Sequence, residues 1–278
     1  MKKSFLLLAL SALMLPAFVA CNKDDSTTEE VKFEAPKYQK AAQKITLQGS
    51  DIKSIEFTES GRYIVERAIV LTKAEEETEF ITGTFTFDGK TYKLDGFGEV
   101  EVSGSGRNVT VTVTEASGET TTVTGSSEAP TSTDPAYRTW KIENVKFKVT
   151  GGDLSSAGVT YTSSKGADLN DIADYLNKNG VKFNADEYEG YNIQYITISG
   201  CGGFIIDFTG EPSYIGESEI KGNSFEYDLE IGGSELINAE GNGTIEFKNG
   251  RLVLTLKGEI NGNSKSYDYS VEFRLLEV

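Results

Sequence analysis

The sequence predicts an all-β protein with two antiparallel β-meander or barrel domains and one short helix in the second. Three observations lead to this prediction. Val109, Val111 and Val113 alternate with threonines, as in a half-buried strand. Turn signals such as Asp88-Gly89 and Asn249-Gly250 recur between apolar segments. A stretch from Gly125 to Thr139 contains serines and prolines but no apolar period, so it divides the chain into two parts.

The first residues have the three parts of a secretory signal peptide. Lys2 and Lys3 precede an apolar run from Phe5 to Leu15, which is too short to cross a bilayer, since that needs about 20 residues. Phe18-Val19-Ala20-Cys21 then resembles a bacterial lipobox. The resemblance implies that residues 1–20 are removed and that Cys21 is lipidated. The alternative is an ordinary signal peptide that is cleaved after Ala20.

Residues 21–42 are predicted to form a disordered, lipidated tether, because they are mostly polar and have no apolar period. Lys23-Asp24-Asp25 resembles the export signal that places Bacteroidetes lipoproteins on the cell surface. This resemblance implies an outer-membrane protein, anchored by lipid at Cys21 and exposed on the cell surface. The periplasmic leaflet is the alternative location.

The composition excludes several classes of function. The net charge is −16 and becomes −18 once Lys2 and Lys3 are removed, which disfavours nucleic acid and anionic lipid headgroups as partners. The sequence contains no histidine, so triad hydrolases and histidine-based metal sites are excluded. With Cys21 lipidated, Cys201 is the only remaining thiol and is expected to be an inert, buried residue. We expect no cofactor and no metal.

The first β domain is predicted to span residues 43–125. Ile55 and Phe57 alternate before a turn at Glu59-Ser60-Gly61, and Tyr63 and Val65 alternate after it. Residues 81–87 and 92–94 form a further pair of strands about the Asp88-Gly89 turn. The valine and threonine strand then turns at Ser117-Gly118 into a strand from Thr120 to Thr124.

A linker is expected at 126–139, and the second β domain at 140–278. Asp168 is a good N-cap for one helix, whose apolar stripe includes Leu169, Ile172 and Leu176 and which Gly180 ends. Asp168, Asn170 and Asp171 also resemble part of a calcium loop, although helix capping explains them fully. Strands follow, with turns at Asn249-Gly250 and Asn261-Gly262 before a last strand.

The two halves also share short segments. Ile55-Glu56-Phe57-Thr58 followed by Tyr63-Ile64 matches Ile206-Asp207-Phe208-Thr209 followed by Tyr214-Ile215. Gly83-Thr84-Phe85-Thr86-Phe87 matches Gly243-Thr244-Ile245-Glu246-Phe247. The two matches favour a common ancestor of the halves, with chance similarity as the alternative.

The second domain resembles the lipocalin-like domains of Bacteroidetes lipoproteins. The resemblance is carried by Trp140-Lys141-Ile142, a single helix and a long run of hairpins that includes Ile206-Asp207-Phe208-Thr209. It covers about half of the chain. It implies a small barrel whose interior either holds one apolar ligand or is filled by side chains. The helix lies early rather than after the last strand, so a lipocalin ligand pocket is not implied. Trp140 is expected in the core at one end of the barrel.

Acidic and aromatic residues gather in the loop after the predicted helix. A sugar could stack on the rings while its hydroxyls donate hydrogen bonds to the carboxylates; the alternative is a solvated loop with half-buried tyrosines. The candidate ligand-binding residues are Asp186, Glu187, Tyr188, Glu189, Tyr191 and Tyr195.

We therefore expect a non-enzymatic, lipid-anchored cell-surface protein that binds an extracellular ligand. This ligand is a glycan, an apolar small molecule or an envelope protein. One alternative is a glycan-acting enzyme that uses paired carboxylates, and another is a purely structural or adhesive display module. No residue is assigned a catalytic role.

Overall fold

A computed structural model describes residues 33–278 apart from 73–74, 182–184, 210–211, 233–235, 238 and 263–264. Within these residues the chain forms strands β1–β18, one α-helix and one 3-10 helix. The predicted all-β class with one short helix is therefore confirmed. Cys21 and the expected tether up to Lys32 lie outside the described residues. No helix in the described part of the chain has the length and apolar character that crossing a membrane requires.

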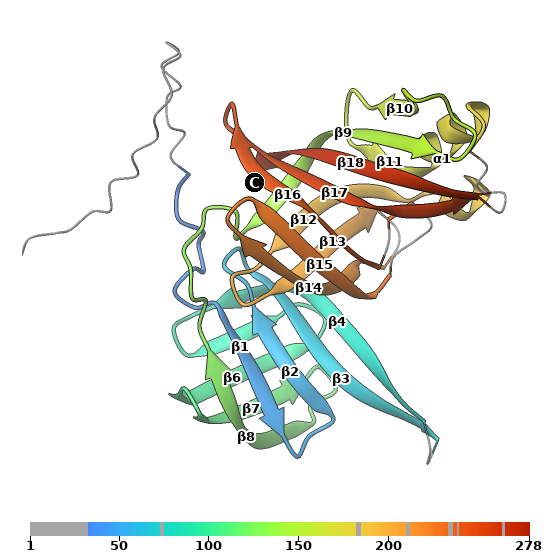
Figure 1. Ribbon diagram of the computed structural model, residues 1–278. Coiled ribbons are helices and arrows are strands. Elements are labelled where there is room, and N and C mark those ends of the chain that lie inside the picture. The colour runs from blue at the N-terminus through green and yellow to red at the C-terminus, as the bar shows by residue number, and fades with distance from the viewer. Residues whose placement is uncertain are drawn as a thin grey trace, which may run out of the picture. The chain divides into compact units, whose positions relative to one another are not determined.

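The first eight strands close into an up-and-down barrel (Figure 1). Each strand pairs antiparallel with the next, and β8 returns to pair with β1 in the register Lys44 to Glu128. The strands are β1 (Gln43–Gln48), β2 (Ile52–Phe57), β3 (Arg62–Thr72), β4 (Glu75–Phe87), β5 (Thr91–Leu94), β6 (Gly98–Ser105), β7 (Asn108–Glu115) and β8 (Thr120–Glu128).

Side chains occupy the interior of the first barrel. Val109, Val111 and Val113 of β7 are buried while the threonines between them face outward, as the alternation predicts. Phe57 stacks on Tyr92 with their ring centroids 3.7 Å apart, and Phe85 packs edge-on against Phe57 at 5.3 Å. An eight-stranded barrel is just wide enough for side chains to fill it, and these rings do so.

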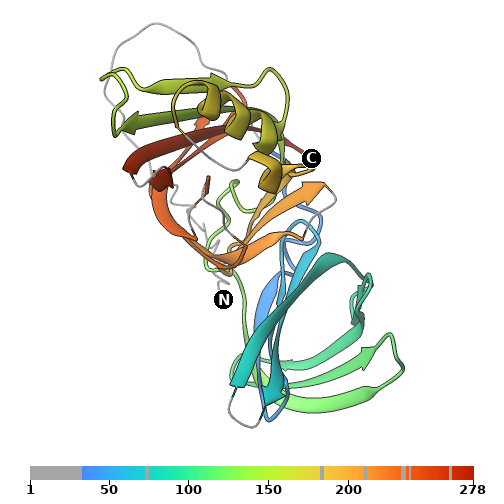
Figure 2. The ribbon, with the colours of Figure 1, turned by 90° about the vertical axis from the view of Figure 1, so that its right-hand side faces the viewer.

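The second barrel is built from eight strands of a ten-stranded sheet. Pairing of β12 with β9, in the register Tyr195 to Lys141, closes the ring. Its strands are β9 (Thr139–Gly151), β12 (Asn192–Ile198), β13 (Gly203–Thr209), β14 (Tyr214–Lys221), β15 (Ser224–Ile231), β16 (Glu240–Lys248), β17 (Arg251–Gly262) and β18 (Lys265–Glu277). Strands β10 (Val159–Thr162) and β11 (Ala167–Asp168) extend the sheet, and Figure 2 shows them beside the helix.

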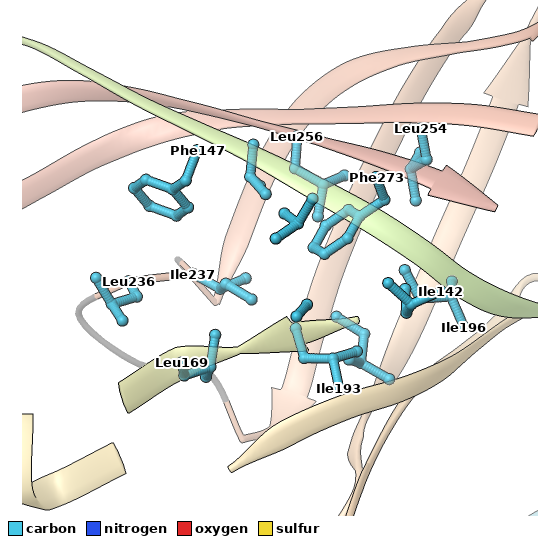
Figure 3. Packing of buried hydrophobic residues seen from close by; sticks show 14 of the residues in the cluster. Ile142, Phe147, Leu169, Ile193, Ile196, Leu236, Ile237, Leu254, Leu256 and Phe273 are labelled. Atoms are coloured by element: carbon cyan, nitrogen blue, oxygen red, sulfur yellow. The ribbon is translucent and has the colours of Figure 1, made fainter. Parts of the chain in front are cut away.

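Large side chains also occupy the interior of the second barrel. Phe147, Phe204, Phe225 and Phe273 are essentially inaccessible to solvent. Leu236, from the segment between β15 and β16, joins the same core together with Ile237. Figure 3 shows both of these residues between Phe147 and Leu169. Of the two alternatives that the lipocalin-like resemblance left open, these contacts support the barrel filled by side chains.

Helix α1 (Leu169–Lys178) forms where the sequence predicts it. The Asp168 side chain accepts hydrogen bonds from the backbone N–H groups of Asn170 and Asp171, at 2.9 and 3.1 Å. This is the N-cap role expected of an aspartate at that position. The apolar stripe of the helix is buried in the core of the second barrel. The 3-10 helix η1 (Ala185–Tyr188) follows it.

Two boundaries differ from those expected. β8 continues to Glu128, inside the expected linker 126–139, because Gly125 to Glu128 pair with β1. The expected turn at Asn261-Gly262 is instead strand, since Asn261 pairs with Ser266 and Gly262 with Lys265. The other expected asparagine-glycine turn is confirmed, with positive φ angles at Asn249 (51°) and Gly250 (73°).

The two sequence matches between the halves lie at non-equivalent positions. The first match covers β2 and the start of β3 in one barrel, and β13 and the start of β14 in the other. The second match lies on β4, the next strand of the first barrel, but on β16, which is two strands beyond β14. A single alignment of the barrels therefore cannot superpose both matches, and this weakens the case for duplication.

Candidate functional site

The structure brings together only part of the predicted ligand-binding loop. Tyr188 is buried in the core of the second barrel, and Tyr191 lies edge-on to it with ring centroids 6.5 Å apart. Tyr191 also packs against Phe208, at 5.7 Å. Asp186 and Glu189 are exposed, and the side chain of Glu187 lies outside the described residues. The two tyrosines thus pack on the barrel rather than forming an open platform.

Tyr195 belongs to a different part of the second barrel. It lies on β12, half-buried and paired with Lys141 and Asp207 in the neighbouring strands. Trp140 is fully buried, as expected, and its indole N–H donates to the carbonyl of Ala136 at 2.9 Å. This bond and its burial make Trp140 part of the core.

The SGCGG sequence from Ser199 to Gly203 forms the turn between β12 and β13 and meets the first barrel. The backbone N–H of Gly203 donates to Oε1 of Glu56, on β2, at 3.0 Å. A Cβ atom on Gly203 would lie 2.6 Å from that same oxygen. Glycine at this position therefore allows a buried carboxylate of one barrel to reach the backbone of the other.

Glu59 makes the second contact of this kind. It lies in the turn between β2 and β3, where its Oε1 accepts a hydrogen bond from the backbone N–H of Gly200 at 3.0 Å. Only 2% of Glu59 is exposed, and its Oε2 is buried with no hydrogen-bond partner. Burial, reinforced by the nearby charge of Glu56, raises the pKa of the Glu59 carboxyl to about 7.

Cys201 lies in the same turn, between Gly200 and Gly203, the two glycines that contact Glu59 and Glu56. It is not reactive. Its Sγ donates a weak hydrogen bond to the carbonyl of Glu128 at 3.7 Å, and the residue is half-buried rather than fully buried. Burial, together with the charges of Glu56 and Glu59, raises the pKa of the Cys201 thiol to about 12. The thiol is therefore protonated at neutral pH.

Ion pairs flank the carboxylates. Arg62 on β3 forms a two-pronged pair with Asp207 on β13, one of whose contacts measures 3.0 Å from Nη2 to Oδ1. Ser213 donates a further hydrogen bond to Asp207 at 2.7 Å. Lys44 contacts Glu217 at 2.6 Å, nearer to solvent. The planar, two-pronged pair of Arg62 with Asp207 fixes the orientation of the two side chains as well as contributing energy.

The apolar part of the junction is small. Ile64 of the first barrel packs with Ile205 and Ile215 of the second, and Phe80 packs against this cluster. The two barrels are thus joined by a contact that is rich in charged and hydrogen-bonded groups around a short apolar centre. Interfaces of this polar kind are common between domains of one chain.

The segment 33–41 lies against both barrels. Phe33 packs edge-on against Trp140 with ring centroids 5.6 Å apart, and the Tyr38 ring packs on Phe85 at 4.8 Å. Arg138, which is 5% exposed, holds this segment: it pairs with Glu277 and donates to the carbonyl of Glu34 at 2.8 Å. The segment is therefore fixed at the junction.

A cavity of about 320 Å³ lies beside this segment. Its lining comes from residues 33–39, from the turn that carries Glu59, and from residues 132–138 before β9. Phe33 and Tyr137 supply aromatic walls, while Glu34, Glu59 and Asp134 supply carboxylates. We call this space the junction cavity. Its lining combines acidic residues with an aromatic wall, as ligand sites do.

Glu56 faces a different and much smaller space. It lines a cavity of about 30 Å³ together with Lys44, Glu66, Glu217 and Glu230. Glu56 and Glu59 therefore line separate cavities. This arrangement gives no support to their acting as a pair on one substrate, as the carboxylates of a glycosidase do.

Sequence reasoning missed the junction. In the sequence Glu59 belongs to an ordinary turn, and Glu56 stands between the alternating Ile55 and Phe57. The signals present were the five-residue run from Ser199 to Gly203, with three glycines, and the acids beside the β2–β3 turn. Neither signal indicates by itself that these two segments meet.

No protein-family model and no curated protein matches the sequence. Among solved structures, the chain is similar to a double mutant of the vaccine antigen transferrin-binding protein B from Haemophilus parasuis Hp5, over 81% of this chain at 10% identity with a TM-score of 0.28. The chain spans about half, 53%, of that protein. It is also similar to a protein of unknown function from Nostoc punctiforme PCC 73102, over 84% of this chain and 94% of that one, at 8% identity with a TM-score of 0.22.

Proposed function

We propose that this chain is a non-enzymatic, lipid-anchored protein of the outer cell surface that binds an extracellular ligand in the junction cavity. The observation that carries the proposal is the junction cavity of about 320 Å³, whose lining combines the rings of Phe33 and Tyr137 with acidic residues that include Glu59. A carboxyl whose pKa is strongly raised, such as that of Glu59, is also typical of functional sites. Side chains occupy the interiors of both barrels, which favours a site outside them.

The anchor is proposed from the sequence alone. The lipobox-like segment at 18–21 supports lipidation of Cys21, and Lys23-Asp24-Asp25 supports export to the surface of a Bacteroidetes-type outer membrane. Residues 22–32 then separate Cys21 from the segment held at the junction. Fully extended, these eleven residues would reach about 40 Å, at about 3.6 Å per residue. The ligand site would therefore stay close to the membrane.

The binding function is tested by native mass spectrometry of the whole chain, extracted gently from its own membrane. A chain with acyl groups on Cys21 and a stoichiometric small-molecule adduct supports the proposal. A bare chain in every preparation contradicts it and favours a display module without a small ligand. Protease treatment of intact cells, with Cys21→Ser as the control, tests surface exposure, and full protection would contradict it.

A glycan-acting enzyme remains the second candidate, since acids line the loop at Asp186 and Glu189 and the junction cavity at Glu59. Such an enzyme would release reducing sugar from oligosaccharides, with activity lost in either Asp186→Asn or Glu59→Gln. The absence of turnover over a broad oligosaccharide panel would exclude this candidate and leave the binding protein.

A further inference from the structure

We propose that the contact between the two barrels is a pH-sensitive hinge, which is closed in mild acid and is progressively weakened as the pH rises through neutrality. The observation that carries this inference is geometric: two buried carboxyl groups of the first barrel bind the backbone of one turn of the second. The inference goes beyond the proposed ligand binding, because it concerns how the barrels are held together whether or not a ligand is bound.

Glu56 and Glu59 supply the two carboxyl groups. They are 3% and 2% exposed, and their Oε1 atoms accept hydrogen bonds of 3.0 Å from the backbone N–H groups of Gly203 and Gly200 respectively. Both glycines belong to the run that joins β12 to β13 in the second barrel. These hydrogen bonds therefore exist only while the two barrels are in contact.

Glu56 owes its burial to the second barrel. Its neighbours Ile55 and Phe57 belong to the core of the first barrel, so strand alternation directs the Glu56 side chain outward. Gly203 and Glu217 of the second barrel line the same cavity of about 30 Å³ as Glu56 and cover it from outside. Opening the contact would therefore return this carboxyl group to water.

The contact carries more acidic than basic groups. Besides Glu56, the small cavity is lined by Glu66 of β3, Glu217 of β14 and Glu230 of β15, and Lys44 of β1 is the one basic group among the described residues that line it. Burial alone would lower the pKa of Lys44, but the hydrogen bond to Glu217 and the nearby carboxylates raise it above its ordinary value, so Lys44 stays charged. One lysine cannot balance four ionised carboxyl groups.

Burial raises the pKa of both carboxyl groups that bind the turn. The pKa of Glu59 is raised to about 7, against an ordinary value of 4.5. The pKa of Glu56 is also raised by burial, although the hydrogen bonds from Ser199 and Gly203 and the charge of Lys44 oppose the change. Both groups therefore bind protons more tightly in the closed state than in the open state. This stabilises the closed contact in full below about pH 4.5, and the stabilisation is lost as the pH rises to about 7.

The other titratable groups that face the two carboxyl groups do not reverse this dependence. Burial raises the pKa of the Cys201 thiol, in the β12–β13 turn, to about 12, so this thiol stays neutral. Burial and nearby acidic groups raise the pKa of Tyr137, in the segment before β9, so its hydroxyl also stays neutral near pH 7. The pKa of Glu230 is raised by burial and by neighbouring carboxylates, which adds to the same trend.

Little apolar surface opposes opening of the contact. Its apolar centre consists of Ile64, Ile205 and Ile215, with Phe80 packed against them. Small and polar interfaces between domains of one chain permit relative motion. Residues 129–138 connect β8 to β9, so the barrels stay joined when the contact opens. Because Glu59 also lines the junction cavity, opening would change the candidate ligand site.

The test is amide hydrogen exchange of the full chain, followed by NMR at Gly200 and Gly203. The N–H groups of these glycines lose their acceptors when the contact opens, so their protection factors measure the opening equilibrium. With the pKa of Glu59 at about 7 in the closed state and 4.5 in the open state, opening becomes about 25-fold more favourable between pH 5.5 and pH 8. We therefore expect both protection factors to fall by about this amount, after correction for the intrinsic rate of exchange.

Two variants assign the pH dependence to the buried carboxyl groups. The double variant Glu56→Gln with Glu59→Gln keeps an acceptor oxygen for each glycine but cannot titrate, so its protection factors should be the same at both pH values. Glu119→Gln, in the exposed β7–β8 turn, is the matched control and should show the same fall as the wild type. Constant protection in the wild type, or a fall that persists in the double variant, would overturn the inference.

Val111 distinguishes opening of the hinge from unfolding, and it does so in the wild type even if the double variant fails to fold. This residue is fully buried on β7 and pairs with Val102 of β6 and Val123 of β8. Because the first barrel stays folded when the hinge opens, we expect the Val111 amide to be at least about a hundredfold better protected than that of Gly203 at both pH values. Equal protection at the two positions would mean that both exchange by unfolding of the chain, and would contradict the hinge.

Discussion

The Glu56 carboxylate accepts a hydrogen bond from the backbone N–H of Gly203 at 3.0 Å, across 147 positions of the chain and between two separate barrels. Burial raises the pKa of Glu56, so the hydrogen bonds from Gly203 and Ser199 partly offset the cost of placing this carboxyl away from water. The contact needs a glycine because a Cβ atom at position 203 would overlap the carboxylate. Together with Glu59 and Gly200, it fixes how the second barrel meets the first.

Replacing Gly203 by alanine should weaken the junction. The new methyl group would displace the Glu56 carboxylate, which would then be buried with fewer hydrogen bonds, at a cost of about 1–3 kcal/mol in the free energy of unfolding. Urea unfolding measures this cost. In a Glu56→Ala background the same glycine substitution should cost much less, because no carboxylate remains to be displaced. Equal costs in both backgrounds would show that the two residues do not interact.

Removing the Arg62 side chain should destabilise the protein more than removing an exposed arginine. Arg62 and Asp207 are 15% and 13% exposed, so Arg62→Ala leaves a largely buried carboxylate without its partner, at about 2–3 kcal/mol. Arg274, whose pair with Glu272 is 3.9 Å long and exposed, is the control and should cost less than about 1 kcal/mol. Similar losses for the two variants would contradict the role assigned to Arg62.

Glu59→Gln should change how stability depends on pH. The pKa of Glu59 is about 7 in the folded chain, against an ordinary value of 4.5, so between these values the folded state binds more protons than the unfolded state. Stability of the wild type therefore falls as the pH rises from about 4.5 to about 7, by about 3 kcal/mol from this residue, and then levels off.

The glutamine variant lacks this contribution. Its stability relative to the wild type should therefore increase with pH over the same window, and urea unfolding at pH 5 and pH 8 measures the change. A difference that is the same at both pH values would show that Glu59 titrates as an ordinary exposed carboxyl.

Cys201 should react slowly with iodoacetamide in the folded protein. With the pKa of its thiol at about 12, the thiolate fraction at pH 8 is about two-thousandfold smaller than for a free cysteine, whose pKa is about 8.5. The experiment uses the Cys21→Ser chain, so that only Cys201 is labelled, and compares native with urea-unfolded protein. Equal rates in the two states would mean that the β12–β13 turn is open to solvent.

Local patterns predicted the strands well because each strand carries its own alternation. The Val109 to Val113 pattern and the Asn249-Gly250 turn are properties of neighbouring residues, and the structure has both. Helix α1 was predictable for the same reason, since the Asp168 cap and the apolar stripe are local. The turn expected at Asn261-Gly262 was wrong because pairing with β18 extends β17 through this apparent turn signal.

The junction could not be predicted in the same way. Its parts are the β2–β3 turn and the β12–β13 turn, which are about 140 residues apart in the chain. Nothing in the sequence of either segment indicates that it contacts the other. The loop from Asp186 to Tyr191 was predicted as the ligand-binding site instead, because its acidic and aromatic residues are close together in the sequence. Burial distinguishes the acidic residues of the junction from those of the loop. Glu59 is buried with an unpaired oxygen, whereas Asp186 and Glu189 face solvent.

The most direct test of the account is a carbon-13 NMR titration of the Glu59 side-chain carboxyl, assigned with Glu59→Gln. We predict a midpoint near pH 7, as expected for a carboxyl that is buried at the junction and has one oxygen without a hydrogen-bond partner. A midpoint near 4.5 would show that water reaches Glu59, and would contradict the buried junction on which the account of the candidate site depends.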